Sequence, residues 1–189
     1  MKIKNFNCIS ADANVEYEID RPICFFCGRG SDTFMDLMRE MIGDCMPHTV
    51  LYDEDRHYVL HADVEIGGKA YRVCYIHNAE GGENRIAVNH VEYSLVFSRE
   101  DTAEYVQLCN RLNKSSVNVL IGTAAAEVAE DTRPIFIYDY FDRLDEAVDI
   151  TPMLDALVAL DRQVFVAVCG RYRPIEHPDV QICTIDLVS

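Results

Sequence analysis

The segment Arg133–Glu146, RPIFIYDYFDRLDE, constrains the fold of this 189-residue chain more than any other. Its first part, Pro134–Tyr138, is a short, mainly apolar run of the kind that forms a strand buried on both faces of a parallel sheet. Acidic residues follow at once, beginning with Asp139. Open α/β sheets bind their ligands at the carboxyl ends of such strands. The segment therefore predicts an α/β fold with Asp139 at the functional edge of its sheet.

Two further apolar runs, Pro22–Cys27 and Gln163–Cys169, are expected to join this strand in the centre of the sheet. The first run ends in a polar turn, Gly28-Arg29-Gly30-Ser31-Asp32-Thr33. A helix is expected next, capped by Ser31 or Asp32, because apolar residues then recur at helical spacing. These residues are Phe34, Leu37, Met38, Met41 and Ile42.

The other segments predict a β-rich region and several helices. Apolar and polar residues alternate through much of residues 50–98, which is typical of half-buried strands, and Gly67-Gly68 predicts a hairpin turn. We expect one domain over residues 1–189, built on a mixed sheet with this region as a β-rich lobe. Further strands are expected at Lys2–Ile9, Val15–Ile19 and Val180–Leu187, and further helices at Ser98–Asn113, Ser116–Ala129 and from a cap at Thr151 onward.

The charge balance limits the classes of partner. The chain has 32 acidic and 17 basic residues, a formal net charge of −15. Such a field repels nucleic acid and anionic membranes unless the bases gather in one place. The N-terminus shows no apolar signal stretch, and no run is long enough to span a membrane. We therefore expect a cytoplasmic protein that binds neither nucleic acid nor membrane directly.

Taken in order, these motifs resemble the ATPase heads of the ABC type, in the branch that includes RecF, RecN and SMC-like proteins. Two strands, an apolar strand, a glycine turn and a helix resemble the family's opening, and a β-rich lobe follows. The run Asn113-Lys114-Ser115-Ser116 resembles the signature motif that precedes a helix in this family. The segment IFIYDYFDRLDE resembles a Walker B strand and D-loop, with Asp145 at the D-loop aspartate.

The resemblance implies a P-loop fold, with ATP and magnesium as the ligands. It places a nucleotide or anion site at the first glycine turn, formed by Gly28, Arg29, Gly30, Ser31 and Thr33. It also implies that Asp139 is a catalytic residue that holds magnesium, and that Ser115 or Ser116 reaches a second copy in a dimer.

The chain departs from the family pattern at the residues that carry the chemistry. The turn has no lysine to reach the phosphates, is about two residues short, and carries Asp32 where phosphates would sit. In a gapless match Tyr138 stands for the magnesium aspartate, whereas a shift by one places Tyr140 at the catalytic glutamate. Cys169 stands where the switch histidine is expected.

These departures favour a degenerate ATPase-like domain that acts as a regulatory or protein-interaction module, with a protein partner or a second copy as its target. Residual nucleotide or anion binding stays open. One alternative is a divergent active ATPase, in which Arg29 supplies the missing charge and dimerisation completes the site. For the turn itself, glycine geometry and helix capping alone are a sufficient explanation.

A second alternative is a thiol-redox or metal protein built on Cys24 and Cys27, a C-x-x-C pair that precedes a helix. Core packing is the favoured explanation of the two cysteines, because the first lies inside the apolar strand. Other potential zinc ligands are present without structural-zinc spacing, namely His48, His57, His61, Cys74 and His77.

Overall fold

The computed structural model of the chain describes residues 1–42, 57–78, 84–88, 91–95, 133–139, 149–168 and 175–187. For residues 78, 84–88, 91–95 and 139 it describes the backbone alone. Several predictions lie outside these ranges: the helices at Ser98–Asn113 and Ser116–Ala129, and the residues Ser115, Ser116, Asp145 and His48.

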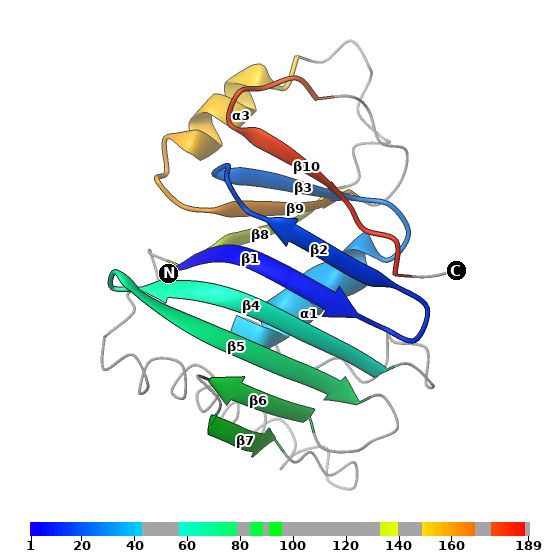
Figure 1. Ribbon diagram of the computed structural model, residues 1–189. Coiled ribbons are helices and arrows are strands. Elements are labelled where there is room, and N and C mark those ends of the chain that lie inside the picture. Colours follow the sequence, from blue (N-terminus) through cyan, green and yellow to red (C-terminus); the bar gives the residue numbers. More distant parts are fainter. Residues whose placement is uncertain are drawn as a thin grey trace, which may run out of the picture.

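One sheet has six strands and is antiparallel throughout (Figure 1). Its central hairpin turns at Gly67 and Gly68, whose φ angles of 57° and 77° require glycine-like freedom, so the predicted hairpin is confirmed. The alternation of apolar and polar residues explains why this sheet buries one face, because every second side chain of its central strands is buried. In spatial order the strands are β2 (Asn14–Glu18), β1 (Lys2–Ile9), β4 (His57–Ile66), β5 (Lys69–Asn78), β6 (Asn84–Val88) and β7 (Val91–Leu95).

The other sheet has four strands, all parallel. Two of its inner strands are buried along their whole length, as their continuous apolar runs predict. Strand β9 lies between β3 and β8, so the glycine turn and the acidic strand tip are one strand apart. In spatial order the strands are β10 (Val180–Thr184), β3 (Ile23–Cys27), β9 (Val164–Val168) and β8 (Ile135–Asp139).

The expected α/β class is confirmed, but the expectation of one mixed sheet is wrong. Strand β1 pairs with β2 and β4, so the antiparallel strands form a sheet of their own. The two sheets meet at β2 and β10 through a side chain: the Tyr17 hydroxyl accepts from the Thr184 amide at 2.9 Å and donates to the Thr184 carbonyl at 3.2 Å. Where the two sheets meet, side-chain hydrogen bonds therefore take the place of backbone pairing between strands.

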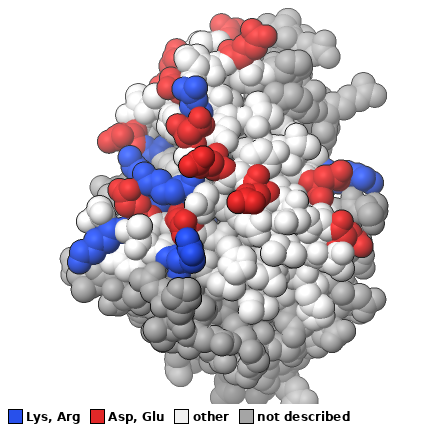
Figure 2. Space-filling view, viewed as in Figure 1, with Lys and Arg blue, Asp and Glu red and all other residues white. Residues whose placement is uncertain are grey.

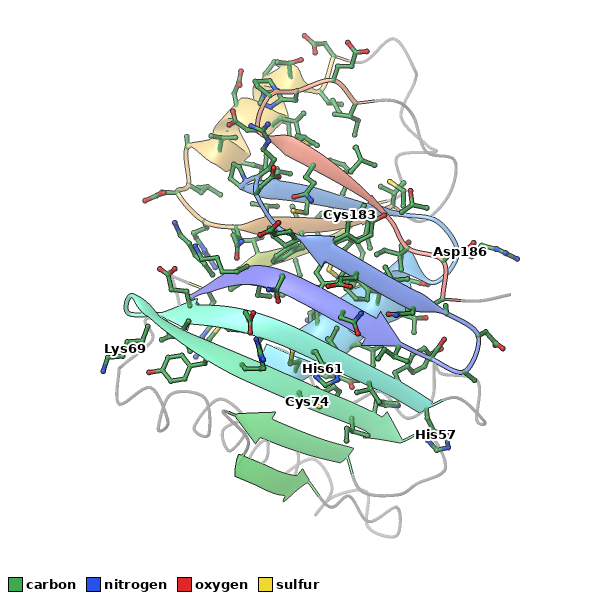
Figure 3. All side chains as sticks on the ribbon, viewed as in Figure 1. His57, His61, Lys69, Cys74, Cys183 and Asp186 are labelled. Carbon is green, nitrogen blue, oxygen red and sulfur yellow. The ribbon has the colours of Figure 1, made fainter. Side chains whose placement is uncertain are left out.

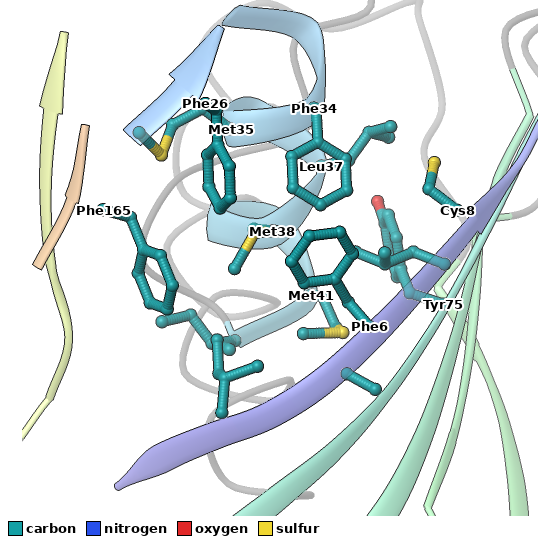
Figure 4. Packing of buried hydrophobic residues seen from close by; sticks show 14 of the residues in the cluster. Phe6, Cys8, Phe26, Phe34, Met35, Leu37, Met38, Met41, Tyr75 and Phe165 are labelled. Atoms are coloured by element: carbon teal, nitrogen blue, oxygen red, sulfur yellow. The ribbon is translucent and has the colours of Figure 1, made fainter. Parts of the chain in front are cut away.

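Helix α1 (Ser31–Ile42) lies between the two sheets and forms the centre of the core (Figures 1 and 4). Its predicted apolar residues are all buried, as is Met35. Phe26 of β3 and Phe6 of β1 each lie edge-on or tilted against Phe34, with ring centroids 4.9 and 4.6 Å apart. Aromatic rings from both sheets therefore fix the helix in place.

Helix α3 (Thr151–Val158) covers the opposite face of the parallel sheet, where Leu154 joins the second cluster of buried residues. The expected Thr151 cap is wrong, because Thr151 is already helical and its amide donates to the Asp149 carboxylate at 2.9 Å. Pro152 lies in the first turn of the helix, where proline is favoured because the missing amide hydrogen would have no partner within the helix. Among the described residues, no helix has the length and apolar character needed to cross a membrane.

Candidate functional site

The predicted turn and the predicted acidic strand end at the same edge of the parallel sheet. Asp139 pairs with Val168 in the register of β8 and β9. On the other side of β9, the Ser31 hydroxyl donates to the Val168 carbonyl at 3.2 Å. The fold therefore places Ser31 and the backbone of Asp139 next to the same residue, Val168, on opposite sides of β9. This is the carboxyl edge, where an open α/β sheet offers a ligand crevice.

The turn after β3 is covered by residues 185–187, which follow β10. The Ile185 amide donates to the Cys27 carbonyl at 2.7 Å, and the Leu187 amide donates to the Arg29 carbonyl at 3.0 Å. Gly28 has a φ of 114°, and a Cβ added to it would lie 2.4 Å from the Ile185 carbonyl oxygen. Residues 185–187 therefore pack directly against the turn and leave no room for a side chain at Gly28. The expected strand Val180–Leu187 is correspondingly shorter and ends at Thr184.

The start of α1 is also occupied by the chain's own groups. Ser31 is 2% exposed, and its hydroxyl is used in the bond to Val168. The Asp32 carboxylate accepts a hydrogen bond from the Thr33 amide at 2.8 Å. A carboxylate at this position takes the place of an anionic ligand at the helix N-terminus. Arg29 points to Asp186 instead, with an ion pair of 3.3 Å between two exposed side chains.

Tyr138, the residue that matches the magnesium aspartate in the gapless comparison, is held by α1. Its hydroxyl donates to the Asp36 carboxylate and accepts from the Arg39 guanidinium at 3.4 Å. The Arg39 guanidinium also lies 5.6 Å from the centre of the Tyr138 ring. Burial, followed by the bond to Asp36, raises the pKa of Tyr138, so its hydroxyl stays neutral and cannot replace a carboxylate as a magnesium ligand.

A buried polar cluster lies deeper between α1 and the antiparallel sheet, and the sequence analysis missed it. The Glu40 carboxylate accepts from the Tyr75 hydroxyl at 2.7 Å and lies 3.1 Å from Nδ1 of His77. Glu40 and His77 are 3% and 1% exposed. Strand alternation could have placed His77 on the inner face, because it continues the series Val73 and Tyr75.

The two cysteines of the C-x-x-C pair point to opposite faces of β3. Cys24 packs in the cluster on the α1 side and Cys27 in the cluster on the α3 side. Residues three apart on a strand alternate in this way, so the pair cannot share a disulfide or a metal ion. Burial raises the pKa of the Cys24 thiol and raises that of Cys27 to about 11. Both are therefore weak nucleophiles at neutral pH.

The histidines considered as zinc ligands are dispersed over the sheet. His61 and Cys74 lie opposite each other on β4 and β5, whereas His57 lies at the end of its strand (Figure 3). Within the described ranges, no group of three or more His, Cys, Asp or Glu side chains could hold a metal ion.

The raised thiol pKa values predict selective labelling. At pH 8 iodoacetamide should leave Cys8, Cys24, Cys27 and Cys183 unmodified in the native protein, since burial raises the pKa of Cys8 and Cys183 to about 12. The half-buried Cys74 serves as the internal control and should react first. Peptide mass spectrometry measures this, and rapid labelling of Cys24 or Cys27 in the folded protein would contradict it.

The same shifts predict a loss of stability at high pH. In the unfolded chain these thiols ionise near the ordinary thiol pKa of 9.0, whereas the folded state keeps them neutral up to about pH 11–12. Their contribution is complete below pH 9 and is lost as the pH rises toward 11–12. Urea midpoints should therefore fall between pH 8 and 10.5. A midpoint that is unchanged over this range would show that the thiols ionise equally in both states.

Comparison with known proteins gives no assignment: no protein-family model matches the chain, and no curated protein matches it significantly.

Proposed function

We propose that this protein is a degenerate ATPase-head-like domain that binds and hydrolyses nucleotide poorly or not at all, and that acts through contacts with a protein partner or a second copy. The closed turn after β3 is the observation that carries the proposal. Residues 185–187 pack against this turn, and the Ser31 hydroxyl and the Asp32 carboxylate are bonded within the chain, which supports a turn without a phosphate ligand.

The arrangement of elements supports the head-like part of the proposal. A parallel sheet carries the glycine turn, α1 and the acidic strand β8 at one edge, and an antiparallel sheet packs on the far side of α1. The resemblance to ABC-type heads implies this combination of a nucleotide-binding core and a β-rich lobe. The same resemblance implies that the strand leading to the switch histidine lies next to the Walker B strand. The corresponding strand here, β9, pairs with β8.

The contacts of individual residues support the proposal that the domain has lost nucleotide binding and hydrolysis. Phosphoryl transfer needs a cation at the phosphates, a hydroxyl for magnesium and a carboxylate on the Walker B strand. Arg29 is paired with Asp186, the Ser31 hydroxyl is bonded to Val168, and Tyr138 is bonded to Asp36. These three side chains, each of which could stand in for a catalytic part, are therefore engaged elsewhere.

Thermal unfolding with and without Mg-ATP tests the absence of a nucleotide site. A ligand at a hundred times its Kd would add about 2.7 kcal/mol of stability. At about 2–4 °C per kcal/mol, this is a rise in Tm of roughly 5–10 °C for a chain of this size. We expect no rise at millimolar Mg-ATP. A rise in the wild type that Asp139→Ala abolishes would contradict the proposal and favour the divergent active ATPase.

Sedimentation equilibrium tests whether association with a second copy depends on nucleotide. Active heads of the resembled type dimerise with nucleotide between them. Because the turn here is closed, we expect any self-association to be the same with and without Mg-ATP. A dimer that forms only when Mg-ATP is added would show that nucleotide still completes an interface.

A further inference from the structure

A cavity of about 340 Å³ opens at the amino edge of the parallel sheet, opposite the edge that carries the closed turn. Pro22 and Gln163, which immediately precede β3 and β9, form part of its wall. Val158, the last residue of α3, and the first strand of the antiparallel sheet complete it. The cavity is thus built from both sheets and a helix, and its volume lies in the range of about 300–1,000 Å³ that is usual for small-molecule sites.

Basic side chains gather at this cavity although the chain as a whole is strongly acidic. Its lining contains four bases and two acids, namely Lys2, Lys4, Arg21, Arg162, Asp20 and Asp161. Figure 2 shows Lys and Arg side chains on this side of the face in view, interspersed with Asp and Glu and next to the N-terminus in Figure 1. The four bases are dispersed in the sequence, so only the fold reveals the patch.

The positive charges of the cavity are only partly neutralised. Lys4 forms an ion pair with Glu65 at 3.0 Å, while Arg21 and Asp20 lie 3.9 Å apart at the outer limit of an ion pair. Lys2 forms no ion pair with any residue in the described ranges. The cavity therefore keeps an excess of cations that an anionic ligand would offset.

Hydrogen bonds hold the wall of the cavity in place. The Gln163 side chain accepts from the Ile3 amide at 2.6 Å and donates to the Ile3 carbonyl at 2.7 Å, which ties β1 to the start of β9. The Arg162 guanidinium donates through Nε to the Arg133 carbonyl at 2.7 Å.

We propose that this cavity binds a small organic polyanion carrying phosphate or carboxylate groups, with Lys2 and Arg21 as its cationic contacts. Arginine side chains bind both oxyanions through paired N–H donors, and lysine adds a point charge. The site is separate from the β3 turn, and it does not depend on the proposed loss of nucleotide binding.

Isothermal titration calorimetry with pyrophosphate and with citrate tests the site and distinguishes the two oxyanions. The titrations use the full chain at constant ionic strength, with sodium sulfate as the control for salt. We expect one of the two polyanions to bind with a Kd in the micromolar to low millimolar range and a stoichiometry of one. The variant Lys2→Gln/Arg21→Gln should weaken this binding by tenfold or more, since it removes both cationic contacts.

A matched variant separates this cavity from the rest of the surface. Lys69→Gln/Arg72→Gln removes the same charge from two exposed residues of β5 outside the cavity, and should leave the Kd within twofold of wild type. The single variant Arg29→Gln separately tests the β3 turn. Binding lost equally in both double variants would show a general charge effect and overturn the proposal. Binding lost only with Arg29→Gln would place the anion at the turn, which would overturn the proposed function as well. Absence of binding by either polyanion would also overturn the proposed site.

Discussion

Gly28→Ala is expected to destabilise this protein strongly. The new Cβ would lie 2.4 Å from the Ile185 carbonyl oxygen, which is backbone and cannot rotate away. The φ of 114° adds strain for any residue with a Cβ. Together, backbone strain and overpacking predict a loss of roughly 3–5 kcal/mol in the free energy of unfolding, measured by urea denaturation.

Gly68→Ala is the control for this experiment, because it isolates backbone strain. Gly68 has a positive φ of 77°, but nothing lies within 4 Å of an added Cβ. Its substitution should therefore cost only about 1–2 kcal/mol. If Gly28→Ala costs no more than Gly68→Ala, residues 185–187 do not pack against the turn as described.

Glu40→Ala is expected to have the second large effect, because Glu40 is the acceptor of a buried cluster. Its removal takes away the carboxylate that receives the Tyr75 hydroxyl and faces Nδ1 of His77. Removing a buried acceptor costs about 1–3 kcal/mol for each donor that loses its bond. Glu40→Gln keeps an oxygen acceptor of the same shape and should cost clearly less. Urea denaturation at pH 7 measures both.

Two tyrosines on β5 provide a matched control for the cluster. Tyr75→Phe removes the hydroxyl bonded to Glu40 and should cost about 1–3 kcal/mol. Tyr71→Phe removes a hydroxyl from the same strand and the same buried face, but no bond to the cluster. Its effect should stay within about 0.5 kcal/mol. Equal costs for the two substitutions would show that the Glu40–Tyr75 bond contributes no net stability.

The parallel strands, α1 and the hairpin could be predicted from local patterns. Pro22–Cys27 and Gln163–Cys169 read as buried strands because they are continuously apolar, and the structure buries β3 and β9 throughout. The turn at Gly67 and Gly68 was equally clear from two consecutive glycines. Such features depend on residues close together in the sequence, so periodicity and turn chemistry reveal them.

The cover of the turn and the basic cavity could not be predicted in this way. Residues 185–187 contact the β3 turn, from which most of the sequence separates them. The apolar pattern of Val180–Leu187 indicates only a strand and not what that strand packs against. The bases at the amino edge come from three separate places in the sequence. Lys2 and Lys4 lie on β1, Arg21 precedes β3, and Arg162 lies between α3 and β9. Their proximity depends on strand order, which local patterns leave undetermined.

Hydrogen exchange at the Ile185 and Leu187 amides tests the closed turn most directly. These amides donate to the carbonyls of Cys27 and Arg29, and the bonds exist only while residues 185–187 cover the turn. We predict slow exchange at both amides, at the same rate with and without millimolar Mg-ATP. Fast exchange, or exchange that Mg-ATP accelerates, would show that the segment leaves the turn to admit phosphate, and would contradict the proposed loss of nucleotide binding.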